Sequence, residues 1–159
     1  MTISAQIAKH LRAVYFGGNW TVSNLKDAIA DVNWQQATAK VETFNTIATL
    51  VYHVNYFVVA ATKVLQGENL NAKDALSFNH PPINCEDDWQ QFLQSVWKDA
   101  ELFANFVEKL PDKKLSEIFS EEKYGTYYRN LNGIIEHLHY HLGQIVIIKK
   151  IIFGKDSEK

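Results

Sequence analysis

Three histidines lie close together in the segment 136–144, which has the sequence EHLHYHLGQ. If this segment is helical, His137 and His141 lie on one face, about 6 Å apart along the axis. Two imidazoles at this spacing can reach one metal ion, as in H-x-x-x-H zinc motifs. His139 points to nearly the opposite side, about 200° around the helix from His137, and is excluded as a ligand of the same ion. The pair therefore predicts a metal site on one helix face.

A third histidine, His53, has a matching position on another predicted helix. It lies between Leu50 and Phe57 in the apolar stripe of that helix, and His137 and His141 are likewise in register with a stripe of isoleucines. Unpaired imidazoles are costly to bury, and a metal ion would satisfy one nitrogen of each while polar neighbours satisfy the other. Candidate polar neighbours are Asn55, Glu136, Tyr140 and Gln144. Spacing and face alone support a metal site and ordinary hydrogen-bonded core histidines about equally.

These histidines must be positioned by helices, because apolar residues recur at three- and four-residue spacing through most of the chain. Proline and glycine, which interrupt helices, number only 3 and 7. We predict an all-α fold in which four amphipathic helices bury their apolar faces against one another as a four-helix bundle. The expected helices cover residues 2–16, 41–66, 86–110 and 125–153, with a shorter helix at 21–32 and stops at Gly67, Pro111 and Gly154.

Two glycines, Gly133 and Gly143, lie inside the last predicted helix. Each costs about 1 kcal/mol relative to alanine in a helix interior, so a reason for them is expected. Close approach of a neighbouring helix is the interpretation we favour, over a roomy pocket above the histidines. The nearby tyrosines Tyr124, Tyr127 and Tyr128 fit a pocket mouth and a dimer surface equally well.

Composition is typical of an ordinary globular protein. The 159 residues suit a single domain spanning 1–159, with 47% hydrophobic and 21% charged residues. A net charge of −2 speaks against a protein that binds nucleic acid, which needs a basic face. No run reaches the roughly 18 apolar residues of a membrane span, and the first ten residues have no apolar signal core. We therefore expect a soluble, cytoplasmic protein with neither a membrane nor a nucleic acid as partner.

The single cysteine, Cys85, excludes a disulfide framework within the chain. It lies near His80 in a loop that contains Pro81 and Pro82, and the two side chains are a second possible pair of metal ligands. Loop pairs seldom form metal sites without further ligands, so we expect a solvated histidine and a half-buried thiol. Glycine-rich phosphate loops and Ser-His-Asp arrangements are absent from the sequence, and no residue is assigned a catalytic role.

The string His137-x-x-x-His141-Leu-Gly-Gln-Ile on a C-terminal helix, with His53 on the second long helix, resembles the signature of the DinB-like superfamily of the YfiT type. The resemblance extends through the chain's length, its helix order and the positions of all three histidines. It implies a four-helix bundle in up-down-down-up order, often dimeric, with His53, His137 and His141 holding a divalent metal ion such as zinc or nickel. The chain departs from the commonest pattern at Leu142, where an arginine is frequent. The resemblance therefore does not imply a cationic side chain next to the metal in this protein.

Three protein ligands leave at least one coordination position open, as in catalytic zinc sites, whereas closed structural sites have four. An open position lets the metal lower the pKa of a bound water to about 7 or hold a thiolate. Because some members of the superfamily are thiol-dependent transferases, we predict a metal-dependent hydrolase or thiol-dependent transferase. It would act as a homodimer on a small molecule such as a thiol. The alternative is a non-enzymatic module that binds a metal or small ligand or serves as a dimeric scaffold, and DNA binding is a distant third.

Overall fold

The computed structural model describes residues 1–156 of the chain, and this part is all-helical, with six α-helices and no strand. The prediction of an all-α fold is confirmed. Four of the helices are long, and two short helices precede the second long one. Three 3-10 turns lie in the connections. The long helices are α1 (Ile3–Phe16), α4 (Ile47–Leu65), α5 (Glu86–Glu108) and α6 (Tyr127–Asp156), and the short ones are α2 (Leu25–Ala28) and α3 (Trp34–Thr38).

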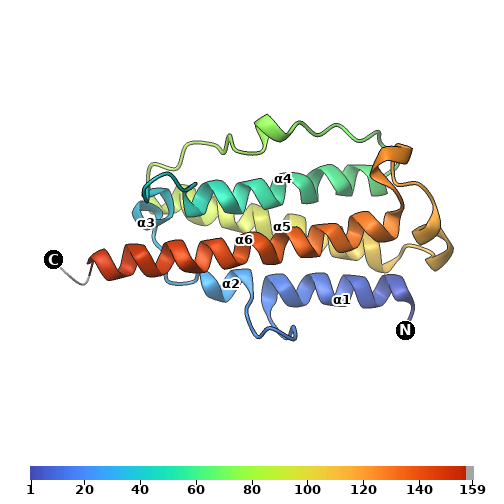
Figure 1. Cartoon of the computed structure of the whole chain (residues 1–159), viewed down its shortest axis with the longest axis horizontal. Helices are drawn as coiled ribbons and strands as arrows, with labels where there is room; N and C mark the ends of the chain where they lie inside the picture. Colours follow the sequence, from blue (N-terminus) through green and yellow to red (C-terminus); the bar gives the residue numbers. More distant parts are fainter. Residues whose placement is uncertain (157–159) are drawn as a thin grey trace.

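The four long helices lie side by side (Figure 1). Helix α1 packs against α5 and α6, and α4 packs against the same two helices from the other side. Helices α1 and α6 run in one direction along the molecule, and α4 and α5 run in the other (Figure 1). Because α4 and α5 point the same way, the connection 66–85 returns along the outside of the molecule before α5 begins (Figure 1).

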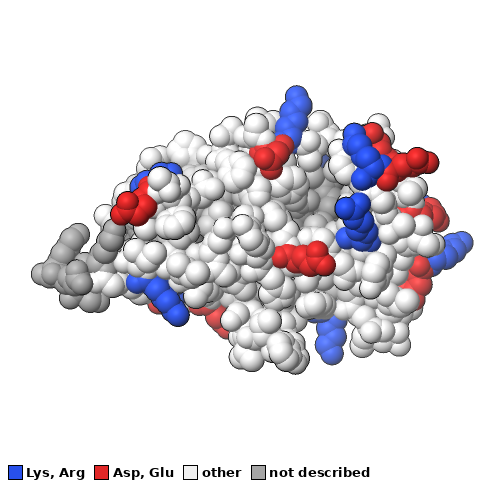
Figure 2. All heavy atoms as spheres, viewed as in Figure 1, with Lys and Arg blue, Asp and Glu red and all other residues white. Residues whose placement is uncertain are grey.

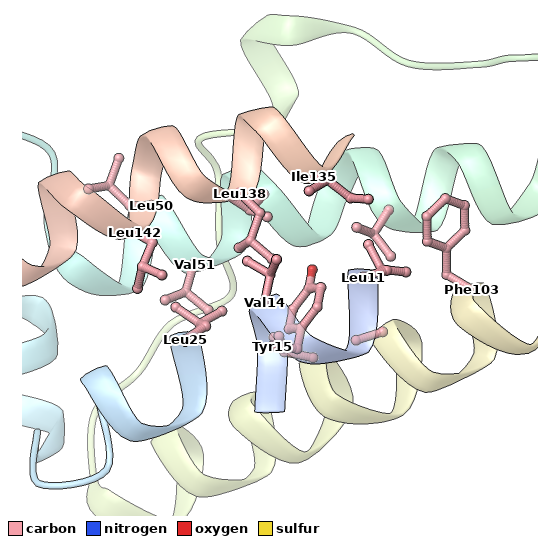
Figure 3. Close-up of a cluster of buried hydrophobic side chains, with 14 of the residues drawn as sticks. Leu11, Val14, Tyr15, Leu25, Leu50, Val51, Phe103, Ile135, Leu138 and Leu142 are labelled. Carbon is pink, nitrogen blue, oxygen red and sulfur yellow. The ribbon is translucent and has the colours of Figure 1, made fainter. Parts of the chain in front are cut away.

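One cluster of buried apolar side chains fills the space between the long helices. Figure 3 shows side chains from all four long helices in this cluster, with Val14 from α1 pointing toward Leu138 from α6, Leu11 from α1 between Ile135 and Phe103, and Val51 from α4 further along. Full burial of such a side chain stabilises the fold by about 1.5–3 kcal/mol. The core is therefore built from all four long helices and does not depend on the histidines.

The helix boundaries follow local capping groups. The Thr46 hydroxyl accepts a hydrogen bond from Thr49 N, which begins α4 six residues later than predicted. Helix α4 ends just before Gly67, as predicted. The φ of Gly67 is 92°, which lies in the left-handed region that favours glycine. There the amide of Glu68 donates to the carbonyl of Lys63 (3.0 Å), as in a Schellman motif. The prediction that Gly154 ends the last helix is wrong, because α6 continues to Asp156.

The predicted helix at 21–32 is also too long. Val22 has a φ of 61°, outside the helical region, and the Asn24 side chain then accepts from Asp27 N to begin the four-residue helix α2. Helix α3 was not predicted. It begins at a capping box in which Asn33 and Gln36 each accept from the other's backbone amide. The predicted helix is thus reduced to α2, and α3 follows it as a separate short helix with its own cap.

Helix α4 is long and apolar enough to cross a membrane by length and composition alone, which the sequence reasoning did not anticipate. It is the one such helix within residues 1–156, and 67% of its most apolar window is buried inside the protein. Burial of this kind is typical of a core helix, because the neighbouring helices cover its apolar surface. The structure is therefore compatible with a soluble protein.

Candidate metal centre

His53 of α4 and His137 and His141 of α6 converge between these two helices. Their candidate ligand atoms all lie within 4.8 Å of one another. The Nε2 atoms of His53 and His137 are 3.0 Å apart. Two nitrogens bound to one zinc ion at about 2.0–2.1 Å lie roughly 2.9–3.4 Å from each other, depending on the angle between the bonds. The predicted convergence is confirmed, and the three rings lie close enough together that they could hold a single divalent ion.

The Ser77 hydroxyl fixes which nitrogen of His53 faces the other two rings. Ser77 Oγ lies 2.6 Å from the carbonyl oxygen of Asp74, which can only accept, so the hydroxyl proton is donated there. The Nδ1 atom of His53, 2.7 Å from the same Oγ, must then carry the ring proton and donate it. In the neutral ring, Nε2 is left with a free lone pair facing His137.

His141 is held in the same form by Gln144. The amide oxygen of Gln144 lies 2.7 Å from His141 Nδ1 and accepts its proton, so His141 Nε2 also has a free lone pair. His53 Nε2 carries no proton, so its 3.0 Å contact is favourable when His137 Nε2 donates or when a cation lies between the two nitrogens. A metal ion bound between these two nitrogens would take the place of the proton that His137 Nε2 otherwise donates to His53 Nε2.

The pKa values of all three imidazoles are lowered. For His137, burial, followed by the charges of His141 and His53, lowers the pKa to about 4. Burial and then the charge of His141 lower the pKa of His53, and burial lowers the pKa of His141 although its hydrogen bond to Gln144 raises it. The rings are therefore neutral near pH 7, which is the form that binds a metal.

These shifts predict that the metal-free protein loses stability as the pH falls from about 6.5 to about 4. Within this window an unfolded histidine binds a proton and the folded His137 does not, since its folded pKa is about 4, so acid favours unfolding. We expect a loss on the order of 2 kcal/mol across the window. Urea unfolding of the chelator-treated protein at several pH values measures it, and a stability independent of pH between 4 and 6.5 would contradict the buried neutral rings.

Aromatic side chains enclose the histidines on the protein side. Phe78 stacks on the His53 ring, with centroids 4.3 Å apart and planes 18° from parallel. Phe57 presents its ring at a steep angle to His53 and His137, at 5.2 and 5.5 Å between centroids. These contacts hold the imidazole planes in place and exclude water from one side of the cluster.

A solvent-open pocket borders His137 on the other side. Its volume is about 440 Å³, and it lies beside the first half of α6, where Gly133 and Glu136 line it together with Tyr124. Figure 2 shows this face of the molecule, which is hollowed beside α6 and flanked by cationic and acidic side chains. A small molecule in this pocket would lie next to the histidine cluster.

This pocket corrects the interpretation of the two glycines. A Cβ added at Gly133 or Gly143 would meet no atom within 4 Å, so the favoured close approach of a neighbouring helix is wrong. Gly133 borders the pocket, and Gly143 is exposed. The tyrosines near the start of α6 differ in their surroundings. Tyr124 lines the pocket, whereas Tyr127 is buried against Phe119.

Of the four polar neighbours proposed from sequence, only Gln144 bonds a cluster histidine. Asn55 donates instead to Asp99 (2.9 Å). Glu136 lines the pocket, and Tyr140 packs its ring against His141 at 4.9 Å between centroids. Sequence reasoning missed Ser77 and Phe78. They lie in the connection 66–85, which has no periodic pattern that could have indicated them.

Replacing Ser77 by alanine should weaken metal binding by about 10–100-fold, the usual effect of losing an outer partner of a metal-bound histidine. Without the hydroxyl, His53 is free to rotate or to change tautomer, and its Nε2 is no longer held toward the other rings. Zinc affinity measured by competition with a chromophoric chelator tests this. Ser95→Ala, which removes an exposed serine on α5, is the control and should bind zinc as the wild type does.

The remaining histidines and the cysteine lie outside the cluster. His139 packs against His10 at 6.1 Å between ring centroids, so its exclusion as a ligand is confirmed. His80 Nδ1 donates to the carbonyl of Pro81 (2.7 Å). Cys85 is exposed, so the expectation of a half-buried thiol is wrong. Across residues 1–156, His53, His137 and His141 form the only group of three or more such side chains that could hold a metal ion.

The cluster combines three neutral imidazoles, partners that fix two of their tautomers, and a pocket that reaches one ring from solvent. Such a set can hold a metal ion that still has a position for an exogenous ligand. No family model, curated protein or solved structure shows a significant match to the chain. The function must therefore be inferred from this geometry.

Proposed function

We propose that this protein is a metal-dependent enzyme, a hydrolase or a thiol-dependent transferase, in which His53, His137 and His141 bind one divalent ion such as zinc or nickel. The observation that carries the proposal is the convergence of three neutral imidazoles beside a pocket open to solvent. A site with three protein ligands keeps a position for water or substrate, whereas a purely structural zinc site has four ligands.

The ion would supply a bound water or thiolate that is nucleophilic near neutral pH. The chain's own residues prepare the site for it. Ser77 and Gln144 hold the protons of His53 and His141 on Nδ1, so that both Nε2 lone pairs face the ion's position. Phe57 and Phe78 pack against the rings and keep them from turning. The pocket beside His137 lets a substrate approach from the other side.

We propose further that the chain is a four-helix bundle of the DinB-like, YfiT-type superfamily and works as a cytoplasmic homodimer on a small-molecule substrate. The helix directions, with α1 and α6 opposed to α4 and α5, are those of an up-down-down-up bundle (Figure 1). The three histidines occupy the helices that the resemblance requires. Light scattering of the purified protein tests the dimer.

Elemental analysis of protein purified without a nickel column tests the metal site. We expect close to one zinc or nickel ion per chain, removable by a chelator and restored by adding the same ion. Metal far below one per chain that neither ion restores would refute the site.

Activity is tested on the same preparations with an activated ester, for hydrolysis, and with an added small thiol together with an electrophile that it attacks, for thiol transfer. We expect turnover of at least one of them that disappears on chelation and returns with the metal. A chain that binds one metal ion but accelerates neither reaction is better explained as a non-enzymatic metal-binding module.

A further inference from the structure

We propose that the substrate of this site is a small anionic molecule with an apolar, aromatic-sized body. Its acid group would be bound by Arg129 and Lys123, and its body would occupy a second, apolar cavity that adjoins the first. This inference rests on the proposed function, since it names the substrate class of the same site. It starts from the shape and lining of two neighbouring cavities.

The second cavity has a volume of about 370 Å³ and lies beside α4. The two cavities share four lining residues, Phe57, Tyr124, Asn130 and Ile134, so they adjoin one another. The first cavity contains the cationic side chains and His137. The second is lined mainly by apolar groups, including Ala60, Ala61, Leu70 and Phe119. A ligand that fills both must therefore have a polar end near the histidines and an apolar end away from them.

The two cations at the polar end are available to a ligand. Within residues 1–156, no carboxylate pairs with Arg129, whose Nη1 donates to the carbonyl of Tyr124 (3.3 Å) and whose other N–H groups remain for a ligand. Lys123 pairs with Glu121 at 3.0 Å, but both side chains are more than 60% exposed. Exposed ion pairs are weak, so an anionic ligand can compete for the lysine.

Acidic groups near the two cavities set the orientation of the ligand. Glu136 lines the first cavity together with two cations, Lys123 and Arg129, whereas Asp74 lines the second, which has no cation in its lining within residues 1–156. An acid group is therefore favoured at the Arg129 end and disfavoured at the Asp74 end. A divalent ion beside His137 would add positive charge to the favoured end.

The segment 119–125, which supplies Phe119, Lys123 and Tyr124 to the cavity linings, is held in place before a ligand binds. The carbonyl of Tyr124 accepts from Arg129 and from Asn130 Nδ2 (3.0 Å), which ties this segment to the first turns of α6. The amide of Phe119 donates to the carbonyl of Gly125 (2.9 Å) and closes the loop on itself. A preformed wall lowers the ordering cost of binding a small molecule.

Gly133 keeps the polar cavity open. It lies in the interior of α6, where its backbone needs no glycine, and an added Cβ would meet no atom within 4 Å. A larger side chain at this position would therefore occupy the cavity without displacing the core. Gly143 lies on the same helix with equally free surroundings but lines neither cavity, and it provides a matched control.

The test uses 4-phenylbutanoate as the probe, with 4-phenylbutylamine and 4-phenylbutanol as probes of the same body and different charge. Calorimetric titration is carried out on the full chain, both metal-free and zinc-loaded. We expect the acid to bind about tenfold tighter than the amine, as charge-assisted hydrogen bonds to a guanidinium predict. Arg129→Gln should weaken the acid about tenfold and leave the alcohol unchanged.

Two leucine variants locate the binding. Gly133→Leu should weaken all three probes at least tenfold and leave zinc content unchanged, while Gly143→Leu should match the wild type. Equal or tighter binding of the amine would overturn the anionic class, and equal effects of the two leucine variants would overturn the location. A chain that binds zinc but not the acid disproves only the substrate class. One that binds the acid in metal-free form but never zinc disproves the proposed function.

Discussion

Replacing His53 by alanine is expected to abolish metal binding at micromolar metal, and with it the metal-dependent gain in thermal stability. His53 is the only cluster ligand from α4, and His137 and His141 would be left as a two-ligand site on one helix. If a full ligand set contributes 10–16 kcal/mol, the loss of one ligand weakens binding by on the order of 10²–10³-fold. The measurement is metal content together with the shift in melting temperature on adding zinc.

The shift on adding zinc is the quantity to compare, because the substitution also leaves a cavity that lowers the melting temperature by itself. His139→Ala is the matched control, since that ring packs against His10 and lies outside the cluster. It should keep full occupancy and the full zinc-induced shift. Full metal occupancy in the His53→Ala variant would show that the ligand set is wrong.

Removing the metal from the wild-type protein is expected to lower the melting temperature by roughly 8–16 °C without unfolding the chain. A ligand present at a thousand times its dissociation constant stabilises by about 4 kcal/mol, and each kcal/mol shifts a domain of this size by about 2–4 °C. The helices should persist, because the buried apolar cluster draws on all four long helices independently of the histidines. Circular dichroism of the chelated protein measures both effects.

Two results would contradict this expectation in different ways. Complete loss of helical signal on chelation would show that the ion is a structural element and that the core is insufficient alone. No change in melting temperature, with metal content already verified, would show that the unfolded chain binds the ion as strongly as the folded one. Re-addition of zinc should restore the original transition, which separates metal loss from irreversible damage.

The sequence predicts the helices well where their signal is periodic and less well where it is local. Long apolar stripes locate α1, α4, α5 and α6, because each stripe must be buried against the others. Their ends depend on single side chains. Thr46 delays the start of α4, Asn24 delays the start of the short helix predicted at 21–32, and Asn33 begins a further short helix that was not predicted. Gly154 does not stop α6, since one glycine costs about 1 kcal/mol and leaves the helix able to continue.

The residues of the candidate site also differ in how well the sequence predicts them, according to whether they lie on regular helices or in the irregular connection. The three histidines could be grouped from their spacing and their place in apolar stripes, because regular helices fix which residues share a face. The Ser77 and Phe78 contacts could not, since the irregular connection that carries them has no period from which to place a side chain. Gly133 stands out in the sequence because glycine destabilises a helix interior. The reason for it is the open pocket beside it, and no sequence pattern reveals such a space.

The connection 66–85 exists because α4 and α5 point the same way, so the chain has to travel back along the molecule before α5 can start (Figure 1). On that path it brings Ser77 to the imidazole of His53. The group that sets the proton of one ligand is thus supplied by a segment outside the helical framework. Changes in the length of this segment would alter the surroundings of His53 while the helical scaffold stays intact, which makes it a natural place for evolutionary drift and for directed insertion libraries.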